Sequence, residues 1–277
     1  YLCGTEPGTR ITDAKDIPDE EGNRRNVLHY NMLFRRKGEL EKVLESFPEF
    51  EFEGGKEGHF VYPSFTRERF TQLKDMVTSM GGFFVHPHPC DLLKSDDCSE
   101  YVFGDFMGIE VFYISLEHRL SAPQYDLWLK ILDKGHRVYA CAGTDTHKLP
   151  TGLIVTTLYA GVLSRDEIVK LLHEGDFVCG NAGIRMCIGS TKMGGVRKLK
   201  DGDILEVSVG DIWQGTEGNV YRADIISRDG IEKSFDFTFG ETKYMLIPAV
   251  KKGFYRVEVT DLSKDQKIAL GNPIWTE

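Results

Sequence analysis

The stretch Tyr139-Ala-Cys-Ala-Gly-Thr-Asp-Thr-His147 joins a short apolar run to an acid and an imidazole that lie two residues apart. Residues 137–141 are predicted to form a buried strand, and side chains two positions apart in an extended chain point the same way. Asp145 and His147 should therefore face one point as they leave this strand. Because carboxylate and imidazole groups both bind divalent metals, the stretch predicts part of a metal site at a strand end.

Strands and helices alternate up to about residue 180. The predicted strands cover residues 1–6, 26–34, 83–85, 108–113, 137–141 and 154–158, and the predicted helices cover residues 38–47, 66–80, 125–132 and 164–173. Thr66 is a suitable N-cap, and Ser164 with Glu167 forms a capping box. This alternation indicates an α/β fold with a mainly parallel sheet, in which functional side chains gather at the C-terminal strand ends.

The pattern changes near residue 182. From there on, short runs of alternating apolar and polar residues are separated by Gly and Asp turns, and no convincing helix lies between them. Such a pattern is typical of an antiparallel sandwich or barrel. We therefore predict an α/β metal-binding domain at residues 1–182 and an all-β, sandwich-like domain at residues 183–277.

Composition limits the partners. The net charge of −9 argues against binding through neutralisation of a nucleic-acid backbone, and no apolar run approaches the roughly 20 residues of a membrane-spanning helix. The six cysteines lack the paired spacing of a zinc ribbon, so most are expected to be reduced core residues. Cys90 and Cys98 flank a polar loop and could pair in an oxidising compartment.

Candidate metal ligands occur in four separate segments, at predicted strand ends except for His29, which lies within a predicted buried strand. They are Glu6, His29, His86 with His88, and Asp145 with His147. A His/Asp/Glu set without cysteine suits zinc, manganese or iron, and a bridging carboxylate such as Glu6 would allow two ions. A metal-activated water suits the hydrolysis of a phosphate ester, which is the predicted chemistry.

Each candidate also has a structural explanation by itself. His29 fits a satisfied core residue, Glu6 fits a loop cap, and the prolines of His86-Pro-His-Pro89 fit a rigid turn. Glu110 is an acid within a buried strand and needs a partner, so we expect it to support a ligand rather than to bind metal directly. The sequence singles out no catalytic side chain, since Cys141 has no base in a motif with it. Taken jointly, the strand-end positions favour a site.

Five short motifs together resemble the PHP (polymerase and histidinol phosphatase) family of metal-dependent phosphoesterases. They are Gly4-Thr-Glu6, His29-Tyr-Asn31, Phe83-Phe-Val-His-Pro87, Gly108-Ile-Glu-Val111 and Gly143-Thr-Asp-Thr-His147. Their order is similar to that of bacterial members that carry a β-sandwich after the catalytic barrel, where a tail like Gly271-Asn-Pro-Ile-Trp275 closes the chain. The resemblance implies a distorted (β/α)7 barrel that holds two or three divalent ions.

The resemblance also implies roles for individual residues. Glu6 would be the bridging glutamate, His29 the histidine of the next ligand strand, His86 that of the His-Pro motif, and Asp145 and His147 the final ligand pair. His88 has no assured counterpart and would be a substrate contact. The family's opening His-x-His and Thr-Asp-His motifs do not occur before His29.

The missing motifs leave two alternatives. The chain is either a fragment whose first strands lie upstream or on a separate piece, or a degenerate family member that cannot hold the full metal cluster. Because the chain begins at Tyr1, within a predicted strand and without Met, we expect it to be a fragment of an incomplete barrel. The leading hypothesis is a hydrolase of small phosphate esters, located in the cytoplasm or, with an upstream signal peptide, outside it. The alternatives are a degenerate binding protein for a carbohydrate or protein partner and a metallohydrolase that acts on a non-phosphate ester or amide.

Overall fold

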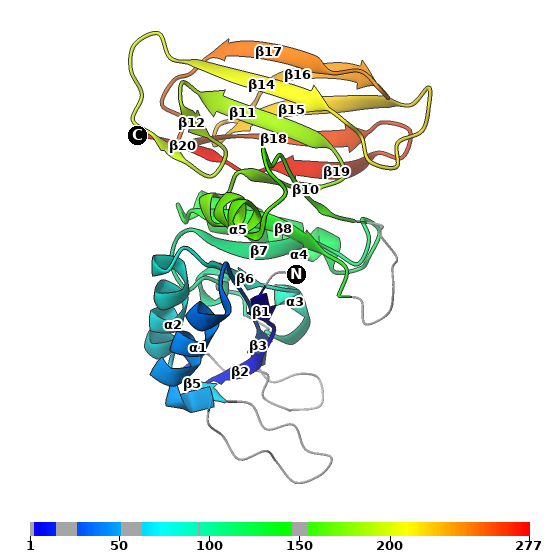
Figure 1. Cartoon of the computed structure of the whole chain (residues 1–277). Coiled ribbons are helices and arrows are strands. Elements are labelled where there is room, and N and C mark those ends of the chain that lie inside the picture. Colours follow the sequence, from blue (N-terminus) through cyan, green and yellow to red (C-terminus); the bar gives the residue numbers. More distant parts are fainter. Residues whose placement is uncertain (1–2, 15–26, 51–62, 94, 146–153) are drawn as a thin grey trace. The chain divides into compact units, whose positions relative to one another are not determined.

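The chain has a mixed α/β fold with many strands, which confirms the predicted class (Figure 1). The computed structural model describes residues 3–14, 27–50, 63–93, 95–145 and 154–277. The described residues form two compact units. The first contains residues 1–110, 123–138 and 162–173, and the second contains residues 111–122, 139–161 and 174–277. Residues 183–277 thus fall within one unit, while the predicted division of the chain at residue 182 stays a prediction.

A five-stranded sheet carries most of the predicted ligand segments. Its strands, in spatial order, are β1 (Cys3–Thr5), β4 (Asn31–Phe34), β6 (Phe83–His86), β7 (Met107–Tyr113) and β8 (Val138–Gly143). The β1–β4 and β4–β6 pairs are antiparallel, and the β6–β7 pair is parallel. The sheet is therefore mixed rather than mainly parallel.

The mixed pairing has a local cause in a small second sheet. That sheet contains β2 (Gly8–Ile11), β3 (Val27–His29) and β5 (Ser64–Phe65), in the order β3-β2-β5. The strands β2 and β3 pair antiparallel, so the chain reverses between β1 and β4. The predicted strand at residues 26–34 is consequently divided at Tyr30, and its two halves belong to different sheets.

The helices follow the capping signals of the sequence. They are α1 (Lys37–Ser46), α2 (Arg67–Ser79), α3 (Pro89–Leu92), α4 (Ser121–Asp133) and α5 (Arg165–Glu174), and the short 3-10 turns are η1 (Pro48–Phe50) and η2 (Cys98–Tyr101). Thr66 accepts the backbone N–H of Arg69 at 3.2 Å, and Ser164 accepts that of Glu167 at 3.1 Å. Both predicted caps are confirmed, because each satisfies an N–H that the first helical turn leaves without a partner.

The described helices and cysteines bear on the expected absence of a membrane-spanning helix and on the possible disulfide between Cys90 and Cys98. None of these helices is long and apolar enough to cross a membrane, as the composition predicted. The thiols of Cys90 and Cys98 are both reduced, so the alternative of a disulfide across the polar loop is not realised.

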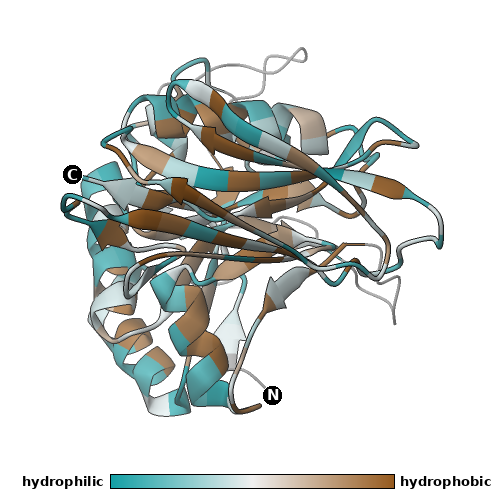
Figure 2. Cartoon of the chain, turned by 90° about the horizontal axis from the view of Figure 1, so that it is seen from above, coloured by the Kyte–Doolittle hydropathy of each residue, from teal (hydrophilic) through white to brown (hydrophobic). Residues whose placement is uncertain are grey.

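The second unit contains two further sheets. One holds β13 (Val196–Arg197), β20 (Ile274–Thr276), β18 (Phe254–Asp261), β19 (Gln266–Gly271), β10 (Phe177–Gly180) and β9 (Thr156–Leu158) in that order, with β15 (Val220–Ser227) on β18 and β16 (Gly230–Thr238) on β15. The other holds β12 (Thr191–Lys192), β11 (Gly183–Ile188), β14 (Ile204–Gly210) and β17 (Lys243–Pro248). Hydrophobic and hydrophilic residues alternate along these strands (Figure 2), and buried residues of both sheets, such as Ile184, Val207 and Val257, share one core. The sheets form a sandwich.

Asn272 joins the tail of the chain to β8 and β10. Its side chain is fully buried, its Oδ1 accepts the Ala140 N–H at 2.8 Å, and its Nδ2 donates to the Phe177 carbonyl at 3.1 Å. One amide therefore satisfies a backbone donor and a backbone acceptor that have no access to water. Buried backbone groups of this kind must be paired, because an unpaired one is costly.

We predict that Asn272→Leu destabilises the protein by about 2–4 kcal/mol, since the apolar side chain leaves both backbone groups buried without a partner. The free energy of unfolding in urea measures this loss. Asn219→Ala is the matched control, because Asn219 is only half-buried, its partner Ser263 is exposed, and its buried partner Asp261 still accepts hydrogen bonds from Ser263. The control should lose less than about 1 kcal/mol. Equal losses in the two variants would contradict the role assigned to Asn272.

Candidate metal centre

Glu6 and His29 lie where the chain passes from one sheet to the other. Glu6 follows β1 and precedes β2, while His29 is the last residue of β3. The register pairs Thr5 with Met32 in one sheet and Gly8 with His29 in the other. These two pairings hold the segment that carries Glu6 next to the segment that carries His29. Strand pairing before and after each residue therefore fixes the position of both side chains.

His88 is placed by an unusual backbone conformation. The strand β6 ends at His86, and His88 then takes φ 30° and ψ 53°, in the left-handed region. This conformation costs a non-glycine residue about 1–2 kcal/mol. The backbone N–H of His88 donates to Oε2 of Glu110 at 2.7 Å, and Pro89 follows as the first residue of α3. Glu110 thus holds the backbone that carries His88. Strained backbone of this kind is concentrated at functional sites.

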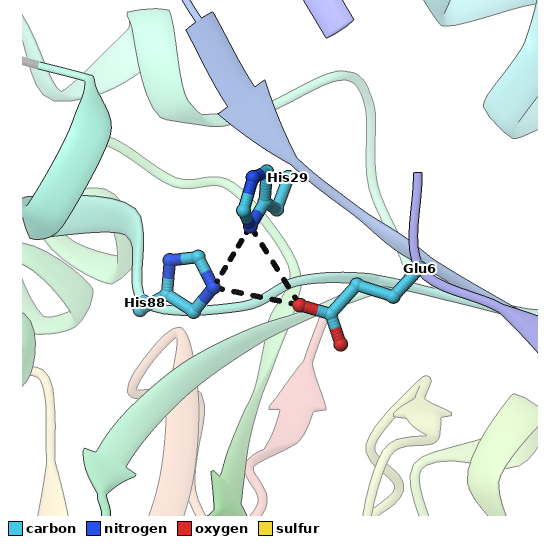
Figure 3. A group of neighbouring side chains, drawn as sticks. All are labelled: Glu6, His29 and His88. Carbon is cyan, nitrogen blue, oxygen red and sulfur yellow. Dashed lines mark hydrogen bonds and ion pairs between the residues drawn. The ribbon is translucent and has the colours of Figure 1, made fainter. Parts of the chain in front are cut away.

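Figure 3 shows that the side chains of Glu6, His29 and His88 converge. Oε1 of Glu6 lies 3.5 Å from Nε2 of His88 and 3.7 Å from Nδ1 of His29, and the two nitrogens are 3.2 Å apart. These are the ligand atoms of the one group of this kind found among the described residues. The three come from three different segments of the first unit.

The spacing of these three atoms fits a metal ion. Zinc binds His nitrogen and carboxylate oxygen at about 2.0–2.2 Å, so two ligands of a tetrahedral ion lie about 3.3–3.6 Å apart. The three measured separations, 3.2, 3.5 and 3.7 Å, lie close to this range. Two imidazoles and one carboxylate also form the ligand set of catalytic zinc sites, which leave a fourth position open.

The charge of Glu6 suits this role. The hydrogen bond with His88 lowers the pKa of the Glu6 carboxyl below its ordinary value, with further lowering from the nearby charge of His88 and His29, although partial burial opposes the effect. The carboxylate therefore stays ionised near neutral pH. An ionised carboxylate is the form that binds a cation.

His86 is buried near this group but makes different contacts. Its side chain is 1% exposed, its Nδ1 lies 3.2 Å from the carbonyl of Tyr101, and its ring stacks on that of Tyr101. Because a carbonyl can only accept, Nδ1 carries the proton and Nε2 is left with its lone pair. A ligand histidine commonly donates its other nitrogen to a carbonyl in this way. The role of His86 as a ligand stays a prediction.

Asp145 lies in the second unit, two residues beyond the end of β8. It is exposed, has φ 43°, and accepts a hydrogen bond from the hydroxyl of Tyr113 at 2.7 Å. Tyr113 is the last residue of β7, so the neighbouring strand positions this carboxylate. His147 lies outside the described residues, and the predicted ligand pair stays a prediction.

The family resemblance gives His88 no assured counterpart among the ligands, whereas the structure places its ring with Glu6 and His29. Period-two alternation would point His86 and His88 the same way. The left-handed residue separates them instead, and hydrophobic periodicity carries no signal for that change. The signal that was available is the second histidine of His86-Pro-His-Pro89. Tyr101 and Tyr113, which contact His86 and Asp145, carried no signal at all.

No protein-family model and no curated protein sequence matches this chain. The geometry of the metal centre must therefore carry the functional argument.

His86 should make the stability of the protein depend on pH. Burial lowers the pKa of His86 to about 4 from an ordinary 6.5. Between these values the unfolded chain binds a proton that the folded chain does not, so stability is complete above pH 6.5 and falls as the pH approaches 4. The free energy of unfolding should fall by about 3 kcal/mol between these two pH values. This fall is measured as the free energy of unfolding against pH, in the presence of a chelator.

The variant His86→Phe isolates this contribution, because phenylalanine keeps a flat ring beside Tyr101 and Phe103 but does not titrate. Its stability should change less between pH 6.5 and 4 than that of the natural protein. Parallel curves for the two proteins would show that His86 is not the titrating group.

Proposed function

We propose that this protein is a metal-dependent phosphoesterase of the PHP type, and that its five-stranded sheet belongs to a distorted (β/α)7 barrel of that family. The observation that carries the proposal is the triangle of ligand atoms on Glu6, His29 and His88, with separations of 3.2–3.7 Å. The order of the sequence motifs supports the same family. The substrate class is a small-molecule phosphate ester.

The donor atoms of the triangle suit zinc, manganese or iron. When bound, such an ion neutralises charge on a phosphoryl oxygen and lowers the pKa of water toward neutrality. Glu6 contributes a carboxylate whose negative charge offsets part of the ion's charge. His29 and His88 contribute neutral nitrogens, which fix position without adding charge. One carboxylate among three ligands leaves the site net positive, as the binding of a phosphate group requires.

Neighbouring residues limit the conformational freedom of the proposed ligand residues. Glu110 fixes the backbone of His88, and the carbonyl of Tyr101 fixes the tautomer of His86. Preorganisation of this kind is needed because a ligand group displaced by about 1 Å loses much of its effect. His86, Asp145 and His147 complete the proposed ligand set by the resemblance to the family, which in full holds two or three ions.

The proposal predicts that the protein purifies with zinc, manganese or iron and hydrolyses p-nitrophenyl phosphate. Elemental analysis after purification without chelator measures the metal. Glu6→Gln and His88→Gln should each weaken zinc binding by at least about tenfold, because each removes one of three converging ligands. His136→Gln is the control, since His136 is half-buried and its ring approaches Asp105, at 4.0 Å, rather than a proposed ligand. Absence of metal from the natural protein, or equal metal in all variants, would contradict the proposal.

The hydrolysed ester separates phosphoesterase activity from the alternative metallohydrolase. If metal is bound but p-nitrophenyl acetate is the better substrate, the phosphoesterase assignment is wrong and an ester or amide substrate is indicated. If metal is bound and neither compound is hydrolysed, the binding-protein alternative gains support.

A further variant tests the final ligand pair. His147→Ala should abolish zinc binding by isothermal titration calorimetry while the melting temperature of the chelator-treated protein changes little, because a ligand at a strand end serves the ion rather than the core. His118→Ala provides a histidine control, since His118 packs against Tyr113 in the second unit. Unchanged zinc binding by the His147 variant would remove this residue from the site.

A further inference from the structure

The side chains on the outer face of the four-stranded sheet point away from the hydrophobic core of the sandwich. On β11, β14 and β17, one set of alternate residues packs into the sandwich core, and the other set points away from it. The register pairs the outward residues in two rows, which are Arg185, Ser208 and Tyr244, then Cys187, Glu206 and Leu246. The six residues form a continuous surface three strands wide.

This surface is the floor of a hollow of about 520 Å³. Tyr159, Asp176 and Lys192 line it together with the six residues, and all belong to the second unit. The volume lies within the range of roughly 300–1,000 Å³ that small-molecule sites occupy. Tyr244 and Leu246 are 76% and 67% exposed. Large apolar groups clustered beside a hollow on a protein surface are characteristic of binding sites.

The polar groups of the hollow are held in place. The guanidinium of Arg185 lies 3.8 Å from the centroid of the Tyr159 ring, and the hydroxyl of Tyr159 donates to Asp211 at 3.1 Å. Lys192 donates to Asp176 at 2.9 Å. Because these groups are already oriented, a ligand would lose less entropy in binding them.

The charges of the hollow select among ligand classes. Arg185 and Lys192 balance Asp176 and Glu206, and each cation already has an aromatic or acidic neighbour. An anion such as a phosphate would meet no excess of positive charge. A peptide strand would find the backbone groups of β11 and β14 already used within the sheet, and among these strands only β17 has an outer edge. The hollow is therefore suited to a neutral ligand.

We propose that this hollow binds a neutral oligosaccharide. The flat C–H faces of sugar rings match the exposed ring of Tyr244 and the side chain of Leu246. Neighbouring sugar hydroxyls match the paired donors of Arg185 and the paired acceptors of Glu206, because charged groups form the strongest hydrogen bonds. The balanced set of donors and acceptors around an apolar floor corresponds to a molecule with many hydroxyls and no charge. This site is independent of the metal centre.

Affinity electrophoresis tests the proposal. The whole protein is run in native gels that contain a neutral polysaccharide (mixed-linkage β-glucan, xylan or galactomannan) or the acidic polygalacturonate. We expect retardation in at least one neutral gel, loss of retardation for Tyr244→Ala, and its retention for Tyr244→Phe, which keeps the ring. Ile231→Ala is the control, because Ile231 is an apolar residue that is also largely exposed, at 64%, and lies on β16 in the other sheet.

Three results would overturn the proposal. They are the absence of retardation in every neutral gel, retardation in polygalacturonate alone, and retardation that Tyr244→Ala leaves unchanged. If sedimentation instead shows a dimer that Tyr244→Ala dissociates, the face binds a second copy of the chain and the saccharide proposal is wrong. The Tyr244 variants should keep the metal content of the natural protein, so failure here is distinct from failure of the phosphoesterase proposal.

Discussion

The candidate metal centre depends on the hydrogen bond from the backbone N–H of His88 to the carboxylate of Glu110, which measures 2.7 Å. Hydrogen bonds to charged groups contribute about 1.5–3 kcal/mol, which is enough to offset the roughly 1–2 kcal/mol that a left-handed histidine costs. Without this bond the backbone after β6 would be free to relax, and Nε2 of His88 would leave Glu6 and His29. The buried carboxylate of Glu110 on β7 thus sets the direction of the His88 side chain, which follows the neighbouring strand β6.

The two histidines of the His-Pro-His sequence show how position changes chemistry. His86 is enclosed by aromatic rings and a carbonyl, and burial keeps it neutral. His88, two residues later, faces a carboxylate whose pKa its hydrogen bond lowers. The first environment favours an uncharged ring of fixed tautomer, and the second favours a cation that His88 and Glu6 share. An uncharged ring leaves one nitrogen lone pair available, which is the property that metal binding needs.

Local features of the fold could be predicted from the sequence, and the distant pairings could not. The helix starts at Thr66 and Ser164 follow from capping chemistry, which involves neighbours only three residues away. The antiparallel pairing of β1 with β4 does not follow, because hydrophobic patterns show that a strand is buried but not which strand lies beside it. Glu6 was identified by its position at a predicted strand end and His29 as a histidine within a predicted buried strand, which the structure ends at His29. The convergence of His88 with Glu6 and His29 could not be predicted, because the direction of His88 depends on Glu110, a residue on another strand.

Asn272 has a consequence for the order in which the second unit can form during synthesis. Its side chain bonds to Ala140, 132 residues earlier, and to Phe177, 95 residues earlier. While residue 272 remains in the ribosome, the N–H of Ala140 and the carbonyl of Phe177 lack the bonds that Asn272 gives them in the native structure. The strand β8, which leads toward Asp145, thus gains this bond only after Asn272 has left the ribosome. Contacts so distant in sequence also slow folding, and a nascent chain would meet chaperones with β8 still incomplete.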